Sequence, residues 1–156
     1  MLVEGDWLKP RRLLTLGHSY AVSMNRRLIH ALRRYGGDRW EVSAVAPQRF
    51  HGRNDLRSVD YVAAEEDLDV VTAVPAFLTR YVHVFSYERQ LKKLLRGDWD
   101  VVHAWEEPYI LAGAQIARHV PKSSRFVFRT AQSIDKRYPP PFCWFENSAV
   151  RRANGW

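Results

Sequence analysis

The chain has 156 residues, of which 46% are hydrophobic and 26% charged, a balance typical of one folded domain rather than a disordered chain. Its formal net charge of +7 favours an anionic partner such as a phosphate, a nucleic acid or an acidic membrane surface, without choosing among them. The single cysteine, Cys143, excludes an internal disulfide and a cysteine-based zinc site.

The N-terminal residues carry no periodic pattern of apolar side chains. Residues 1–10 are therefore predicted to be a leader, and residues 11–156 a single domain. The leader lacks the charged and apolar regions of a signal peptide, and no run of about 18 apolar residues, enough to span a membrane, occurs in the chain. We therefore expect a cytoplasmic protein.

The next part of the chain predicts a βαβ unit. Residues 12–16 are an apolar run that stops at Gly17, as expected of a buried strand followed by a turn. Residues 24–35 repeat apolar side chains at helical spacing, with Ser23 as a candidate N-cap, and residues 40–46 form a second strand. Strand, helix and strand in this order predict parallel strands joined by a right-handed crossover.

The predicted helix has one apolar and one basic face. We expect the apolar face to contact the sheet and to consist of Met24, Leu28, Ala31, Leu32 and Tyr35. The opposite face carries arginines that could lie against anionic lipid, where each charge contributes about 1 kcal/mol, or could simply be solvated. These arginines are Arg26, Arg27, Arg33 and Arg34.

The middle of the chain alternates polar and apolar segments. Residues 48–58 are predicted to be a long surface loop, and residues 68–74 the third strand. The acidic run at residues 65–67 is predicted to be a solvated turn rather than a metal site, because metal ligands must converge in space. A helix follows, with an apolar face formed by Tyr87, Leu91, Leu94 and Leu95.

Residues 98–109 are the stretch where chemistry is most expected. Residues 101–104 suit a strand buried on both faces, and His103, Glu106 and Glu107 lie at or just past its end. Pro108 is predicted to occupy the first turn of the next helix. Ligands of open parallel sheets gather at the carboxyl ends of the strands, so we expect these polar groups to line a cleft there.

The remaining elements complete an α/β protein with five parallel strands. A helix of small apolar residues ends before Pro121, residues 125–130 form the fifth strand, and residues 131–137 are a polar connector. Three prolines precede a last helix that starts near Phe142. No dinucleotide fingerprint and no Gly-Lys-Ser/Thr phosphate loop occurs, so no cofactor is predicted, and no metal site is predicted either.

Several motifs together resemble a known family. They are Asp100-Val101-Val102-His103, Glu106-Glu107-Pro108, residues 126–130 running into Ala131-Gln132-Ser133, and residues 136–142 followed by Glu146. In this order they resemble the N-terminal domain of retaining GT-B glycosyltransferases of the family 4 type. The resemblance implies a Rossmann-like parallel sheet with helices on both faces, which is one half of a GT-B enzyme.

The resemblance also implies a function. Such enzymes transfer a sugar from a nucleotide-sugar donor to a hydroxyl acceptor, such as a glycan or a lipid-linked molecule, and some contact the inner face of the membrane. The acceptor lies mainly on the N-terminal domain and the donor on a second domain, which this sequence does not contain. We therefore expect a fragment or split product that is inactive alone and binds the nucleotide sugar weakly.

Candidate site residues follow from the resemblance, each with a structural alternative. The loop Gly17, His18 and Ser19 would approach the donor diphosphate, or it is a plain turn after the first strand. The acceptor would contact Glu106, Glu107, Lys136 and Arg137, although adjacent glutamates usually diverge and the two cations could be solvated. The catalytic candidates are His103, which could equally be a core residue, and Gln132.

Two positions depart from the family pattern. Gln132 and Trp105 stand where many relatives have histidine. An amide can hydrogen-bond a sugar hydroxyl but cannot accept a proton near neutral pH, so general-base catalysis at Gln132 is in doubt.

A second hypothesis treats the chain as a basic binding module for nucleic acid or an anionic membrane. It is based on the net charge and on Trp40, Trp99 and Trp105 as stacking surfaces for single strands. These tryptophans lie in or beside predicted strands rather than in one basic stripe, which makes nucleic acid the less favoured partner.

Overall fold

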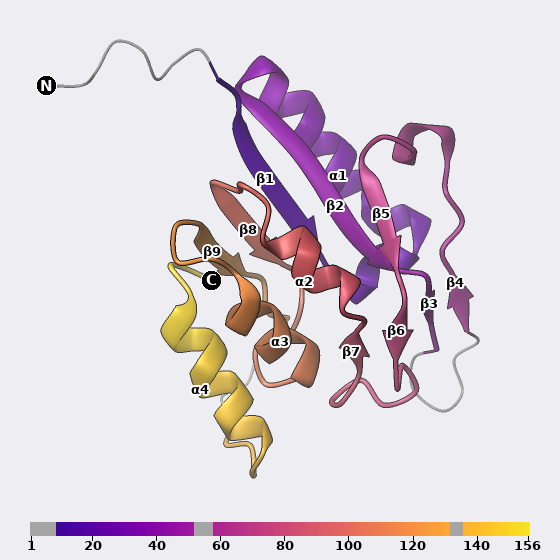
Figure 1. The fold of residues 1–156 in the computed structure, drawn as a ribbon. Coiled ribbons are helices and arrows are strands. Elements are labelled where there is room, and N and C mark those ends of the chain that lie inside the picture. Colours follow the sequence, from indigo (N-terminus) through magenta and orange to yellow (C-terminus); the bar gives the residue numbers. More distant parts are fainter. Residues whose placement is uncertain (1–8, 52–57, 132–135) are drawn as a thin grey trace, which may run out of the picture.

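Five parallel strands form the central sheet of the protein (Figure 1). The computed structural model describes residues 9–51, 58–131 and 136–156. The predicted α/β class is confirmed, since the sheet is Rossmann-like and has helices on both faces. The strands, in spatial order, are β5 (Val71–Val74), β2 (Trp40–Pro47), β1 (Arg11–Leu16), β8 (Val101–Ala104) and β9 (Arg125–Phe128).

The strand order creates a topological switch point between β1 and β8. From β1 the chain moves outward through β2 to β5, then returns to the other side of β1 to add β8 and β9. Leu16 pairs with Ala104, so β1 and β8 end at the same level. The loops that follow these two strands lead away in opposite directions, which is the usual position of a ligand crevice in an open α/β sheet.

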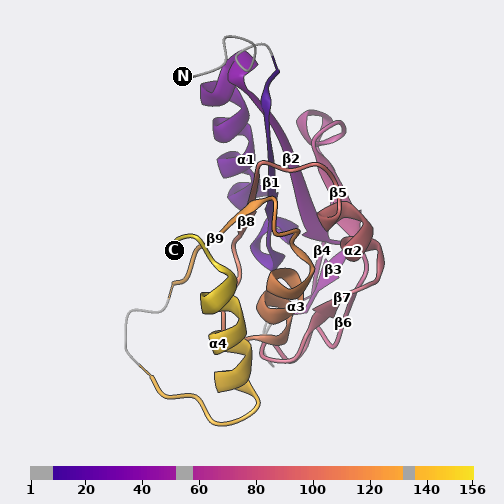
Figure 2. The same ribbon diagram turned by 60° about the vertical axis from the view of Figure 1, so that its left-hand side comes forward.

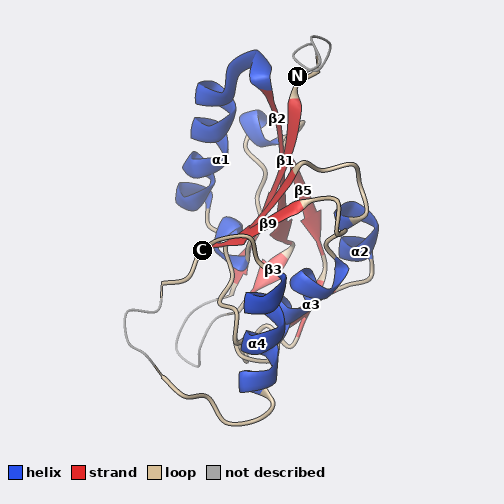
Figure 3. Ribbon diagram, turned by 90° about the vertical axis from the view of Figure 1, so that its left-hand side faces the viewer, coloured by secondary structure: helices blue, strands red, loops and turns tan. Residues whose placement is uncertain are grey.

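Helices cover both faces of the sheet, as Figure 3 shows with the strands seen nearly edge-on. One face is covered by α1 (Ser23–Gly36), and the other by α2 (Gln90–Leu95) and α3 (Leu111–His119). The last helix, α4 (Phe142–Arg152), packs beside α3 (Figure 2). Short elements complete the chain: η1 (His18–Ala21), η2 (Gly37–Arg39), η3 (Glu65–Asp67), and the antiparallel pairs β3 (Arg49–Phe50) with β4 (Val59–Asp60) and β6 (Ala76–Phe77) with β7 (Ser86–Tyr87).

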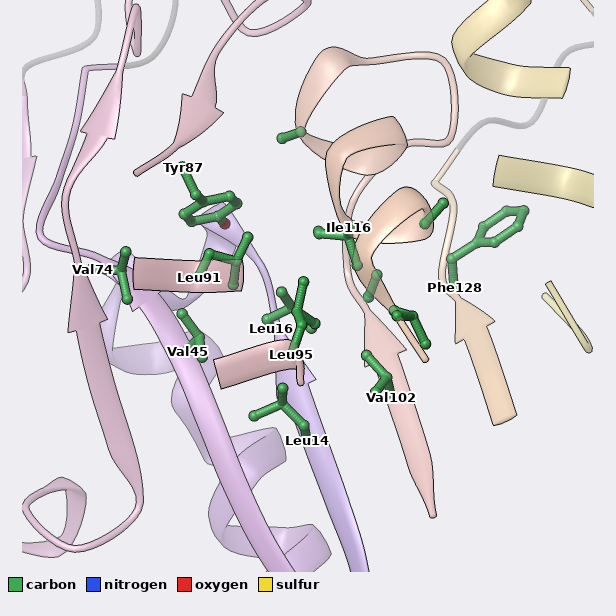
Figure 4. Close-up of a cluster of buried hydrophobic side chains, with 14 of the residues drawn as sticks. Leu14, Leu16, Val45, Val74, Tyr87, Leu91, Leu95, Val102, Ile116 and Phe128 are labelled. Atoms are coloured by element: carbon green, nitrogen blue, oxygen red, sulfur yellow. The ribbon is translucent and has the colours of Figure 1, made fainter. Parts of the chain in front are cut away.

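The larger core lies between the sheet and the helices α2 and α3 (Figure 4). Leu14 and Leu16 of β1 point into it, together with Leu91 and Leu95 of α2, and each of these side chains is at most 1% exposed. Burying one such side chain stabilises the fold by about 1.5–3 kcal/mol. A second cluster on the α1 side centres on Tyr20 and five apolar residues: Ile29, Val42, Ala44, Ala46 and Val70.

The contact face of α1 differs from the predicted one. Met24 and Tyr35 were expected to pack on the sheet but are 67% and 79% exposed, whereas Ile29 is fully buried and Arg26 is 2% exposed. The helix is therefore rotated toward Arg26, because a buried carboxylate receives that side chain. Ser23 is the first helical residue rather than the N-cap, which is Val22. The expected lipid-facing row of arginines is consequently broken at Arg26.

The carboxylate that binds Arg26 belongs to Asp67, in the run expected to be a solvated turn. Asp67 is 1% exposed and accepts hydrogen bonds from Arg26 Nε at 2.8 Å, His30 Nε2 at 2.9 Å and the Ala64 amide at 2.9 Å. Burial raises the pKa of Asp67, but these three partners outweigh it and hold that pKa below its ordinary value of 3.8. The pair joins α1 to the segment that leads into β5.

Arg26 also holds the segment that follows β1. Its guanidinium donates to the carbonyl oxygens of Tyr20, Ala21 and Val62 and lies 4.7 Å from the centre of the Tyr61 ring. Tyr20 and Ala21 belong to η1, which begins at His18. One buried cation therefore connects α1, η1 and the connection to β5.

Several other boundaries differ from those expected. The third strand, expected over residues 68–74, begins at Val71, and the fifth, expected over residues 125–130, ends at Phe128. Tyr87 lies in β7, and the helix starts at Gln90 because the chain first pairs with β6. Pro108 lies in a turn before α3, which begins at Leu111 with Ile110 as its N-cap. The expected loop over residues 48–58 contains β3, and its residues 52–57 fall outside the described part of the chain.

The outer edge of β9 is paired with residues near the end of the sequence. The Asn154 amide donates to the Phe126 carbonyl at 2.6 Å, and the Phe128 amide donates to the Gly155 carbonyl at 3.3 Å. Asn154 Oδ1 accepts the Phe126 amide at 2.8 Å. Across the residues that the structure describes, no helix has the length and apolar character needed to cross a membrane.

Candidate functional site

The loops after β1 and β8 touch at the switch point. Trp105, the first residue after β8, donates its amide to the Leu16 carbonyl at 2.7 Å. A Cβ atom on Gly17 would lie 2.7 Å from the Trp105 carbonyl oxygen, closer than side-chain atoms approach a carbonyl. Glycine is therefore required at residue 17 for the two loops to meet, and their contact places His18 beside Glu106.

His18 and Glu106 form a tightly bonded pair. Glu106 Oε2 lies 2.5 Å from His18 Nδ1, and Glu106 Oε1 accepts the His18 amide at 2.6 Å and the Tyr87 hydroxyl at 2.7 Å. The Glu106 side chain is fully buried, whereas the His18 side chain is 25% exposed. The carboxylate thus anchors the ring through Nδ1, and no hydrogen bond from any described residue reaches Nε2.

Aromatic rings fix the plane of the His18 imidazole. It stacks on Phe50 with ring centres 4.6 Å apart and meets the edge of Phe85 at 5.5 Å. Phe50 and Phe85 belong to the core on the α2 and α3 side of the sheet. His18 is therefore held in one orientation by a carboxylate on one side and by apolar rings on the others.

The surroundings of the His18 ring raise its pKa. Burial alone would lower the pKa of His18, but the charge of Glu106, the hydrogen bond to it and the charge of Glu107 raise that pKa above 6.5. Burial and the neighbouring Glu106 charge raise the pKa of Tyr87 far above 10, so its hydroxyl remains a donor. Nδ1 donates to the Glu106 carboxylate, and in the protonated ring the second N–H is at Nε2.

A titration of His18 tests this electrostatic description. Because the folded-state pKa lies above 6.5, protonation of His18 adds stability that is complete below pH 6.5 and is lost as the pH rises through the folded-state pKa. We expect Glu106→Gln to lower the pKa of His18 below 6.5, since burial then dominates, and to abolish this part of the pH dependence of stability. NMR of the His18 ring and thermal unfolding across pH measure the two effects.

The matched control is Glu107→Gln, which removes a charge from the adjacent residue. Glu107 acts on His18 through its charge alone, so this variant should lower the pKa of His18 by less than Glu106→Gln does. An unchanged pKa of His18 in Glu106→Gln would contradict the description.

Glu107 points away from Glu106 and toward the end of β9. Its oxygens accept the Thr130 hydroxyl at 2.5 Å and the Ala131 amide at 2.8 Å. The side chain is half-buried. Since a carboxylate has about four lone-pair sites, roughly two remain for further donors. The two adjacent glutamates diverge as expected, and only Glu107 can offer oxygen atoms to an external hydroxyl.

His103 lies on the opposite face of the sheet from the His18 pair. Its strand neighbours Val102 and Ala104 point into the core under α2 and α3, so His103 points to the α1 side. Its Nδ1 lies 2.8 Å from the Thr15 hydroxyl, which is 2.7 Å from the Tyr20 hydroxyl. Burial and the charge of Arg129 lower the pKa of His103. The expected single cleft is thus divided, and His103 belongs to a separate, neutral cluster.

The other predicted residues lie around this edge. The Ser19 carbonyl accepts the Val22 amide, which closes η1, and also accepts Asn25 Nδ2 from the first turn of α1. Lys136 and Arg137 are exposed and precede Tyr138, whose ring stacks on Tyr109 at 4.0 Å. Gln132 falls outside the described residues. The His18 amide, expected to approach a donor phosphate, contacts the Glu106 carboxylate here.

Three aromatic contributors to the pair were missed in the sequence: Tyr87, Phe50 and Phe85, of which Phe85 was assigned no role. Tyr87 was placed on a helix face, and Phe50 in a surface loop, yet both touch the His18 and Glu106 pair. Tyr87 and Phe50 each lie in a two-residue strand, which is too short to show the alternation of apolar and polar side chains that marks a strand in a sequence. The only signal for Phe50 is that it is an aromatic residue within a polar segment, and Tyr87 is marked only by its place just after the mostly apolar residues 82–85.

The three tryptophans do not share a surface. Trp40 begins β2 and Trp99 lies just before β8, whereas Trp105 follows β8 at the opposite edge of the sheet. Each ring is contacted by an arginine guanidinium: Arg11 on Trp40, Arg12 on Trp99 and Arg129 on Trp105. A single nucleic-acid strand could therefore stack on all three rings only if it contacted both the amino ends and the carboxyl ends of the strands.

Among the residues that the structure describes, no three or more histidine, cysteine, aspartate or glutamate side chains are grouped so as to hold a metal ion. Comparison of the chain with protein-family models, with curated proteins and with solved structures finds no match.

Proposed function

We propose that the chain is the acceptor-side domain of a GT-B glycosyltransferase, which moves a sugar from a nucleotide-sugar donor to a hydroxyl acceptor. The proposal is supported by the strand order, by the contact of the β1 and β8 loops and by the motifs that resemble the family. In the intact enzyme a second domain would bind most of the donor. The isolated chain is then expected to transfer no sugar.

The observation that carries the proposal is the divergence of Glu106 and Glu107 at the switch point. Glu106 is buried and raises the pKa of His18, and the protonated ring would donate from Nε2 to a phosphate oxygen of the donor. Glu107 retains acceptor capacity beside Thr130, which suits it to bind a sugar or acceptor hydroxyl. The adjoining loops after β1 and β8 would thus offer the His18 ring to the leaving diphosphate and the Glu107 carboxylate to hydroxyl groups.

Binding of small glycosides to the 156-residue chain tests the acceptor role. We expect saturable amide shifts at Glu107, Thr130 and Ala131 in heteronuclear NMR titrations, with a dissociation constant of about 1 mM, which corresponds to about 4 kcal/mol. Glu107→Gln should weaken this binding about tenfold, because it removes a charge-assisted hydrogen bond. Arg33→Gln, far from this edge on α1, is the control and should leave the binding unchanged.

Two results would refute the proposal. One is the absence of saturable shifts at these amides with every glycoside of a panel of common hexosides. The other is tight oligonucleotide binding that falls steeply with salt, which would favour the basic binding module instead.

A further inference from the structure

A cationic hollow lies between α2 and α3, outside the site described above. It has a volume of about 560 Å³. Its lining contains five groups that can carry positive charge, the polar side chain of Gln115 and two buried leucines, and no carboxylate from any described residue. The five groups are Arg89, Lys92, Lys93, Arg96 and His119.

The spacing of the four lysines and arginines places them together. Residues 89, 92, 93 and 96 are related as i, i+3, i+4 and i+7, so they share one side of the α2 segment. All four are exposed, and none forms a salt bridge with a described carboxylate. Like charges at this spacing repel one another, and an anion bound between them would remove the repulsion.

The opposite wall of the hollow is formed by Gln115 and His119 of α3. The side-chain amide of Gln115 in α3 accepts the Tyr87 amide at its oxygen, at 2.9 Å, and donates from its nitrogen to the Tyr87 carbonyl at 2.7 Å, which holds α3 against β7. His119 Nδ1 lies 2.8 Å from the Gln115 carbonyl oxygen. Because a carbonyl oxygen only accepts, the hydrogen is on Nδ1, and Nε2 of His119 is left toward other groups.

We propose that this hollow binds a small soluble anion that carries two or more phosphate groups. Its volume lies within the usual range of small-molecule sites and exceeds that of one phosphate. Arginine and lysine side chains bind phosphate oxygens through charge-assisted hydrogen bonds. The site is separate from the His18 and Glu106 pair, and the proposal does not depend on sugar transfer.

The lining disfavours the two macromolecular alternatives. Peripheral membrane helices insert apolar side chains beside their cations, but Leu91 and Leu95 are both 0% exposed and cannot insert. Single-stranded nucleic acid is bound with aromatic stacking, and no aromatic side chain of the described residues lines the hollow. A soluble multivalent anion needs neither feature.

Calorimetric titration of the 156-residue chain with inorganic pyrophosphate tests the proposal. Lys92→Gln with Lys93→Gln should weaken binding about tenfold or more, because two charge-assisted contacts are lost. The control is Arg33→Gln with Arg34→Gln, which removes the same charge from exposed positions of α1 and should change the affinity by less than about twofold, since these residues lie outside the hollow. Unchanged thermal unfolding of both double variants would show that they remain folded.

Three outcomes would overturn it. The first is the absence of saturable pyrophosphate binding. The second is an equal loss of pyrophosphate affinity in both double variants, which would indicate a response to net charge alone. The third is a chain that does not bind pyrophosphate but co-sediments with phosphatidylglycerol vesicles, and that loses this co-sedimentation in the Lys92→Gln, Lys93→Gln variant. That result would assign the two lysines to a membrane surface.

Discussion

Asp67→Ala is expected to lower the free energy of unfolding by about 3–5 kcal/mol, the usual cost of leaving one member of a buried ion pair without its partner. Arg26 is 2% exposed, so its charge cannot gain solvent when Asp67 is removed. The Ala64 amide and His30 lose an acceptor in the same variant. Chemical denaturation followed by circular dichroism measures the change.

A second aspartate of the chain provides the control. Asp60 also forms an ion pair, with Arg49, but both partners are more than half exposed to solvent. Surface pairs of this kind contribute little, so Asp60→Ala should leave the unfolding midpoint unchanged. If Asp67→Ala were no more destabilising than Asp60→Ala, the carbonyl groups of Tyr20, Ala21 and Val62 alone would be sufficient to hold the Arg26 charge.

The Asp67 pair also predicts a specific sensitivity to acid. Because the pKa of Asp67 is lower in the folded protein than its ordinary 3.8, ionised Asp67 stabilises the fold above that value. This contribution is lost as the pH falls through the folded-state pKa. The same variant should therefore lose part of the acid dependence of stability, while Asp60→Ala retains it.

Glu106→Ala is expected to cost about 3–5 kcal/mol and to release His18 from its fixed position. The variant leaves the His18 amide, the His18 ring and the Tyr87 hydroxyl without their acceptor, and each buried unsatisfied group costs about 1–3 kcal/mol. Thermal or chemical unfolding gives the stability, and the NMR signals of His18 report its mobility.

Two neighbouring substitutions separate the roles of charge and shape at this position. Glu106→Gln keeps an oxygen for the His18 amide and the Tyr87 hydroxyl, so its cost should be about 1–2 kcal/mol. Glu107→Ala, from the adjacent but half-buried residue, should cost about 1 kcal/mol. Equal destabilisation by Glu106→Ala and Glu107→Ala would show that the buried carboxylate is not what holds the two loops together.

Local pattern was sufficient to predict the layers of the fold. The short apolar runs at residues 12–16 and 101–104 form central parallel strands as predicted. Val102 and Ala104 are buried, but Val101 and His103 are only half-buried, so the expected burial of β8 on both faces is wrong for the α1 side. The class and the parallel pairing follow from the alternation of such runs with helices. The edge at which the polar groups gather was also predictable, because parallel strands end together.

Contacts between distant residues were not predictable in the same way. Periodicity assigned Arg26 to the solvated face of α1, because a cation is buried only where an anion meets it, and Asp67 lies 41 residues further on. Tyr87 and Glu106 are 19 residues apart and meet only after α2 has folded onto the sheet. Successive side chains of a strand point to opposite faces of the sheet. This rule alone places His103 on the other face from Val102, but the prediction of a single cleft did not use it.

The pairing of Asn154 and Gly155 with β9 affects how the molecule meets its neighbours. An outermost strand normally exposes unpaired amide and carbonyl groups to which a strand of another molecule can add. The amide and carbonyl of Phe126 and the amide of Phe128 are already bonded within the same chain. Intermolecular extension of the sheet is therefore blocked at that margin, and an assembly of several copies would have to use side-chain surfaces there.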